Sequence, residues 1–96
     1  MQEEIREMNE YVNPIDFSYE WMRCKDLIIK FNFSGKWEFD YSTSCFIYCI
    51  GITCIQVDET HAWFGSIIMN ISDFDKDKFK NQVLEKYPTI IWPTEK

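Results

Sequence analysis

Residues 45–54, CFIYCIGITC, lie in the most apolar run of the chain and contain three of its four cysteines. From about Ser44 to Val57, apolar side chains occupy both alternating sets of positions, and many of them are β-branched or aromatic. This pattern predicts a strand in the middle of a sheet that is covered on both faces, and it disfavours a helix. Gly51 lies at the centre of the run, which indicates a bulge or a bend there.

The cysteines of this run raise the question of a metal site or a nucleophile. Structural zinc sites need paired ligands about two to four residues apart at tight turns, so that four ligands converge on one ion. In an unbroken strand, Cys54 points away from Cys45 and Cys49, because successive side chains alternate between the two faces. We therefore interpret these cysteines as small buried apolar residues. Only a sharp bend at Gly51 brings Cys54 back toward Cys49.

Residues 27–41, LIIKFNFSGKWEFDY, place aromatic side chains at alternating positions before and after a loop. A loop over residues 34–36 pairs Phe33 with Trp37 on one face of a hairpin. The same register sets a lysine opposite an aspartate on the other face, so charge and packing agree. We therefore expect two antiparallel strands in this segment.

The first segment, QEEIREMNEYV at residues 2–12, has helical periodicity and places Ile5, Met8 and Val12 on one side. Asn13-Pro14 ends this helix, because the residue before a proline avoids the α region. The segment that follows, DFSYEWMR at residues 16–23, alternates aromatic and polar side chains, which favours a strand. Asn13 as an N-cap with Pro14 as the first helical residue is the alternative, and it begins a second helix.

Downstream of the apolar run, HAWFGSIIMNI at residues 61–71 is a further strand candidate. A helix is predicted from about Ser72, with Ser72 as its N-cap, to Tyr87, because Pro88 stops its continuation. TIIWP, residues 89–93, adds a short edge strand that Pro93 limits. The buried stripe of the predicted helix consists of Phe79, Val83, Leu84 and Tyr87.

The predicted architecture is α+β, with an N-terminal helix, a mainly antiparallel sheet of four or five strands and a C-terminal helix packed on one face. The 96 residues make one domain, residues 1–96, because a chain of this length supports a single core. Aromatic residues are 18% of the chain, so the core is expected to be rich in rings.

The net charge of −6 is concentrated at the start of the chain, where residues 1–20 carry six acids and one base. Such a protein repels phosphate, so we expect neither direct nucleic-acid binding nor membrane binding, whereas a basic protein is attracted to it. The N-terminus is acidic and has no apolar signal region, and the apolar stretch from Cys45 to Ile55 is about eleven residues long where a membrane helix needs about twenty. A cytoplasmic location with reduced thiols is therefore expected.

Catalytic patterns are weak in this sequence. His61 is the single histidine and follows Asp58 and Glu59, which is typical of an ordinary surface pair. The alternating aspartates of SDFDKDK, residues 72–78, fail as a calcium loop because lysine stands where an EF-hand requires glycine. We expect no enzyme activity, no catalytic residues, no metal and no cofactor.

A small, acidic, aromatic-rich domain of this kind fits a protein that binds and neutralises another protein. The leading hypothesis is an immunity or inhibitor protein, of the bacterial toxin-immunity or phage counter-defence type, that covers the active site of a basic toxin or nuclease. The alternatives are a small ligand-binding or enzymatic domain and a self-associating structural module. The predicted partner-binding residues are acidic positions of the first helix and aromatic residues in weakly assigned segments: Glu3, Glu7, Glu10, Tyr11, Tyr19, Trp21 and Trp92.

Overall fold

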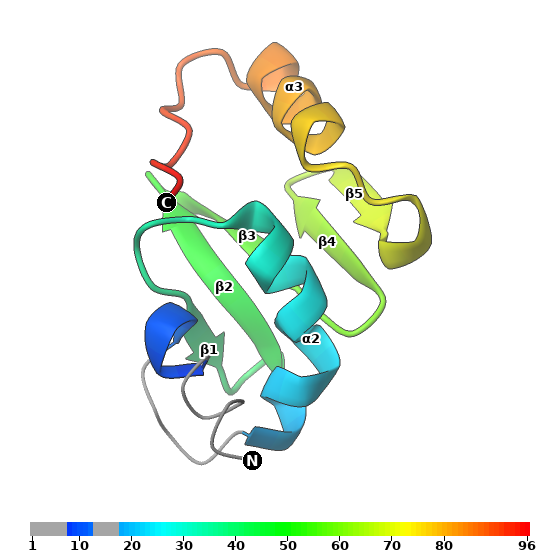
Figure 1. Ribbon diagram of the computed structural model, residues 1–96. Helices are drawn as coiled ribbons and strands as arrows, with labels where there is room; N and C mark the ends of the chain where they lie inside the picture. The colour runs from blue at the N-terminus through cyan, green and yellow to red at the C-terminus, as the bar shows by residue number, and fades with distance from the viewer. Residues whose placement is uncertain (1–7, 13–17) are drawn as a thin grey trace.

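A computed structural model describes residues 8–12 and 18–96 of the chain. They form a five-stranded antiparallel sheet with helices before and after it, so the predicted α+β class is confirmed (Figure 1). Residues 8–11 form a short helical turn ahead of the elements that carry labels. In chain order these elements are α2 (Ser18–Phe31), β1 (Glu38–Asp40), β2 (Cys45–Ile50), β3 (Thr53–Val57), β4 (His61–Phe64), β5 (Ile67–Asn70), the 3-10 turn η1 (Ile71–Asp73) and α3 (Lys76–Lys86).

The sheet is a meander in which each strand pairs with its neighbour in the sequence, in the order β1-β2-β3-β4-β5. Two-residue turns connect β2 to β3 at Gly51-Ile52 and β4 to β5 at Gly65-Ser66. Both glycines have positive φ, 63° and 59°, which suits glycine in a tight hairpin turn. The prediction of one strand from Ser44 to Val57 is therefore wrong, because the chain reverses at Gly51. The predicted strand over residues 61–71 is likewise two strands.

Residues 18–31 form α2, so the strand predicted over residues 16–23 is wrong from Ser18, where the described part of it begins. Of the hairpin predicted over residues 27–41, the first strand is wrong for the same reason, whereas the second is present as β1 and pairs with β2 instead. The apolar side chains at alternating positions, Ile29, Phe31 and Phe33, suggested a strand, although the apolar residues of the whole segment repeat with the helical period of 3.6 residues. The buried side chains of α2 follow that helical period: Trp21, Cys24, Leu27, Ile28 and Phe31. The alternative of a second helical segment is confirmed from Ser18 onward, whereas its predicted start at Asn13 and Pro14 lies outside the described residues. Asn32 ends α2 with a φ of 56°, a left-handed conformation that asparagine tolerates.

The hydrophobic core lies on one face of the sheet. Side chains of α2, of α3 and of residues 8–12 all join one cluster with the core face of the strands. Phe31 is fully buried at its centre, with ring centroids 5.3 Å from Phe33 and 5.4 Å from Phe79. On the other face of β2, Cys45 is buried at the start of the strand, but Ile47 is half-buried and Cys49 is exposed. The prediction that this run is covered on both faces is therefore wrong.

The C-terminal helix begins three residues later than predicted. The side chain of Asp75, not Ser72, is the N-cap, and it accepts a hydrogen bond from the Lys78 backbone N–H at 3.1 Å. Ser72 lies instead in η1. Phe79 and Val83 are buried as expected, whereas Leu84 and Tyr87 are only partly buried.

The chain end returns to the loop that follows α2. The backbone N–H of Ser34 donates to the carbonyl of Thr94 at 2.8 Å, and that of Lys96 donates to the carbonyl of Asn32 at 2.8 Å. Only a single bridge, between Phe33 and Glu95, results. The edge strand predicted over residues 89–93 is therefore wrong, because pairing begins only after Pro93, which has no N–H to donate.

Candidate functional site

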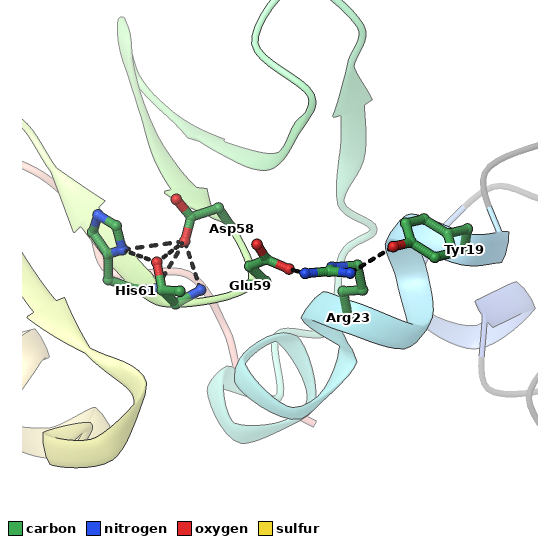
Figure 2. Close-up of polar contacts among 6 residues, drawn as sticks. Tyr19, Arg23, Asp58, Glu59 and His61 are labelled. Carbon is green, nitrogen blue, oxygen red and sulfur yellow. Dashed lines mark hydrogen bonds and ion pairs between the residues drawn. The ribbon is translucent and has the colours of Figure 1, made fainter.

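A cleft of about 250 Å³ lies between the first half of α2 and the turn that joins β3 to β4. Figure 2 shows that side chains from the helix and from the turn face each other across it. Its lining comes from three segments that are distant in sequence, and one of them is Ser44, the residue before β2. The helix contributes Tyr19, Glu20, Arg23 and Cys24, and the turn contributes Asp58, Glu59 and Thr60.

Asp58 organises the turn between β3 and β4. Its Oδ1 accepts hydrogen bonds from the backbone N–H groups of Thr60 and His61, each at 2.8 Å, and from the Thr60 hydroxyl at 3.0 Å (Figure 2). Burial works to raise the pKa of Asp58, but these hydrogen bonds outweigh it and hold the pKa below its usual value. Asp58 is therefore a carboxylate at neutral pH, held in place by the backbone of its own turn.

His61 is oriented by the same turn. Its Nδ1 lies 2.5 Å from the Thr60 hydroxyl oxygen and 3.2 Å from Oδ1 of Asp58. Its ring centroid is 5.2 Å from that of Trp63, on the same strand. Of the two acidic neighbours that the sequence offered as local partners, Asp58 and Glu59, His61 contacts Asp58, and this contact orients the ring at the start of β4.

Arg23 connects the helix to the turn across the cleft. Its guanidinium forms an ion pair with Glu59 and donates a hydrogen bond to the Tyr19 hydroxyl at 2.5 Å (Figure 2). It also lies 5.3 Å from the centroid of the Tyr19 ring, within cation–π range. Tyr19 is 67% exposed, so its ring forms an accessible rim of the cleft.

The cleft is acidic, because Glu20, Asp58 and Glu59 face a single guanidinium among the lining residues. Its thiol is unsuited to nucleophilic chemistry: burial, followed by the charge of Asp58, raises the pKa of Cys24 to about 12. A thiol with that pKa remains protonated at neutral pH. The arrangement therefore suits recognition of a cationic side chain by carboxylates better than it suits attack on a substrate.

The acidic residues predicted to bind a partner are only partly described. Glu3 and Glu7 lie outside the described residues. Glu10 is exposed, and its Oε1 lies 3.8 Å from Nζ of Lys96. Among the predicted residues that the structure describes, Tyr19 is the one that lines the cleft.

The aromatic candidates differ in exposure. Tyr11 and Trp21 are 8% and 1% exposed and stack with their ring centroids 6.2 Å apart, so the expectation that they are accessible is wrong. Trp21 is buried because it begins the apolar stripe of α2, a helix that the strand prediction concealed. Trp92 is partly buried, with its ring centroid 5.5 Å from that of Phe33.

The sequence analysis did not predict that Arg23 and the acidic turn, residues 58–60, belong to one site. The signal for the turn was present, because Asp58-Glu59-Thr60 is a polar triplet between two apolar strands. Its proximity to Arg23 depends on α2 crossing the sheet, which the sequence pattern did not show.

A second, apolar groove of about 420 Å³ lies at the tip of the β2–β3 hairpin, next to residues 89–91. Ile52 in the turn is fully exposed, and Ile91 is 86% exposed. Large apolar side chains in such positions are typical of contact surfaces when they gather into a patch.

Among the described residues, 8–12 and 18–96, no three His, Cys, Asp or Glu side chains gather closely enough to hold a metal ion. None of the helices in these ranges combines the length and apolar character needed to cross a membrane. Comparisons with models of known protein families, with curated proteins and with solved structures find no match for the chain. The indications of function therefore come from the shape and charge of the surface itself.

Proposed function

We propose that the protein binds a basic protein partner and neutralises it, in the manner of an immunity or inhibitor protein directed against a toxin or nuclease. The observation that carries this proposal is the acidic cleft between α2 and the β3–β4 turn, with exposed Tyr19 at its rim. The cleft has room for one lysine or arginine side chain, and its three carboxylates exceed the one guanidinium present.

The partner's cation would enter the cleft beside Asp58 and Glu59. The bonds that organise the turn all use Oδ1 of Asp58, and Figure 2 shows the second carboxylate oxygen clear of them. Glu59 is paired with Arg23, and an incoming arginine exchanges for that guanidinium without breaking a backbone contact. Planar guanidinium groups bind carboxylates through paired hydrogen bonds, which favours arginine as the entering residue.

Tyr19 and the overall charge support the same type of contact. Tyrosine is enriched among the residues that dominate binding energy at protein interfaces, and this ring is accessible beside the cleft. The net charge of −6 accelerates the encounter with a basic protein by long-range attraction. A partner whose active surface binds nucleic acid carries the cationic side chains that this site accepts.

The experiment is affinity capture from the native host at low salt, followed by calorimetric titration of the purified partner. The double variant E20K/E59K is expected to weaken binding by at least about tenfold, which is about 1.4 kcal/mol. Arg23→Ala is expected to strengthen binding, because it removes the cation that competes for Glu59. Affinity of the wild-type protein should fall as salt concentration rises.

Glu85→Lys is the matched control, because Glu85 is exposed on α3, away from the cleft. This substitution reverses one charge of the same kind, where E20K/E59K reverses two, and so reports the effect of net charge per reversal without the cleft. Wild-type affinity in E20K/E59K, or an equal loss in E85K, would show that the cleft is not the contact. Failure to capture any partner would contradict the function itself.

A further inference from the structure

Cys49 and Cys54 face each other across the β2–β3 hairpin, one residue pair from its turn. Their Sγ atoms are 2.9 Å apart, so less than about 1 Å of movement separates them from a disulfide bond of about 2.05 Å. The closing pair of the turn is Ile50 with Thr53, and Cys49 with Cys54 is the next pair along the ladder.

The position in the ladder suits a disulfide. Residues that flank a two-residue turn form a hydrogen-bonded pair, so the next pair, Cys49 with Cys54, is of the non-hydrogen-bonded type. In such pairs the Cα atoms are about 4.5 Å apart, which lies within the range of about 4.4–6.8 Å that disulfides occupy. The backbone therefore needs no rearrangement to accommodate the bond.

We propose that Cys49 and Cys54 form a reversible oxidation site, which closes to an intramolecular disulfide on reaction with a low-molecular-weight disulfide such as oxidised glutathione. This inference depends on the hairpin geometry alone and not on the proposed function.

Accessibility determines which thiol reacts first. Cys49 is exposed, whereas Cys54 is partly buried. Burial, together with the hydrogen bond to Cys49, raises the pKa of Cys54 to about 11, so this thiol stays protonated at neutral pH. Cys49 is therefore the thiol that meets the external disulfide, and Cys54 is the resolving thiol.

The reaction proceeds by two exchanges. The Cys49 thiolate attacks one sulfur of the external disulfide and expels the first small thiolate, which gives a mixed disulfide at Cys49. Cys54 then loses its proton and attacks the Cys49 sulfur, which expels the second small thiolate. In total, two protein thiols and one external disulfide become one protein disulfide and two small thiols, with two electrons passing from the protein to the oxidant.

The other two cysteines are unsuited to this reaction and serve as internal controls. Cys24 and Cys45 are both buried, and burial is the main cause that raises the pKa of each thiol. Closure between residues 49 and 54 would fix the short loop that carries Gly51 and the fully exposed Ile52. Oxidation is therefore expected to restrict the apolar tip of the hairpin and to leave the core unchanged.

The test equilibrates the full chain in glutathione buffers of increasing oxidised fraction, quenches with acid and alkylates the remaining thiols. Chymotrypsin cuts after Tyr48 and Trp63, which leaves Cys49 and Cys54 in one fragment, apart from Cys24 and Cys45. In oxidising buffer this fragment is expected to lose the mass of two hydrogen atoms and to carry neither alkyl group nor glutathione. Return to reducing buffer restores two alkylatable thiols.

Variants separate the two steps. C24S/C45S is expected to behave as the wild-type protein, because its reactive pair is intact. C54S is expected to accumulate a mixed disulfide with glutathione at Cys49, and C49S is expected to form no disulfide within the fragment. Two alkylated thiols in the oxidised wild-type fragment, or a lasting glutathione adduct on it, would overturn the proposal. Unchanged circular dichroism of C24S/C45S confirms that the comparison is made on folded protein.

Discussion

The guanidinium of Arg23 on α2 is paired with the carboxylate of Glu59 on the β3–β4 turn, so helix and turn meet through side chains at the acidic cleft. The two side chains remain 46% and 43% exposed, and water competes for both of them. Asp58, one residue away, is bound instead by the backbone of its own turn. The cleft thus combines an exchangeable ion pair with a fixed carboxylate, and these two features predict different consequences of mutation.

Removal of the exchangeable pair should leave the fold nearly intact. Arg23→Gln is expected to lower the free energy of unfolding by no more than about 1 kcal/mol, because exposed ion pairs contribute little after solvent screening. Urea denaturation at low and high salt measures this difference, which should shrink as salt rises. A double-mutant cycle with Glu59→Gln isolates the pair. A coupling free energy well above 1 kcal/mol would show that the pair is a structural element of the fold.

Asp58 should matter more for stability and should do so in a pH-dependent way. Asp58→Ala is expected to cost about 1–3 kcal/mol at pH 7, because it leaves the turn without a charged acceptor for its N–H groups. The pKa of Asp58 in the folded state lies below the ordinary value of 3.8, so its charge stabilises the folded state above that value. This contribution should decline as the pH falls below 3.8 and disappear below the folded-state pKa.

Asp58→Asn tests the direction of this pH dependence, because the amide keeps an acceptor oxygen but carries no charge. Urea denaturation of both proteins at pH 7 and at pH 3 should give a larger stability difference at pH 7. Serine or threonine variants of exposed Asp77, on α3, serve as the control for general charge effects. A difference that stays constant or grows at low pH would contradict the role assigned to the carboxylate.

The sequence predicted the class of the fold better than its elements, and α2 shows why. Helical and strand periods both fit residues 27–33, because Phe31 belongs to the apolar set of each pattern. The choice between them depends on contacts with Phe79 and Trp92, which lie far along the chain. Such long-range packing overrides the local pattern, and a short stretch of sequence does not reveal it.

Prediction of the candidate sites was limited in the same way, because contacts between residues distant in sequence cannot be read from a local pattern. Gly51 was correctly identified as the position where the apolar run bends, and the condition set for Cys54 to approach Cys49 is met. The acidic cleft could not be predicted, because it requires α2 to bring Arg23 beside Glu59. The bend at Gly51 could therefore be predicted from the sequence, whereas a site formed by segments distant in sequence could not.

The aromatic core should be sensitive to loss of its central ring. Phe31→Ala is expected to cost about 3–5 kcal/mol, because it removes a fully buried ring and leaves a cavity among its neighbours. Domains of this kind have a total stability of about 5–15 kcal/mol, so the variant should be near its unfolding threshold at 37 °C. Tyr41→Ala removes a ring that is 63% exposed and should change stability by less than about 0.5 kcal/mol. Thermal and urea unfolding of both variants measure the contrast, and equal losses would place Phe31 outside the core.

The two hairpin glycines should differ in their tolerance of a side chain. Gly51 and Gly65 share a left-handed conformation, so alanine at either position should cost about 1–2 kcal/mol of backbone strain. At Gly51 an added β-carbon meets nothing within 4 Å, whereas at Gly65 it lies 3.2 Å from Cζ of Tyr87 and closer still to its hydroxyl. Gly65→Ala should therefore be more destabilising than Gly51→Ala in urea denaturation, because the Tyr87 ring must move away from its contact with Phe64. Tyr87→Phe removes the hydroxyl and should recover part of the loss in the Gly65→Ala background. Equal costs at the two glycines, with no recovery, would show that the Tyr87 ring moves freely.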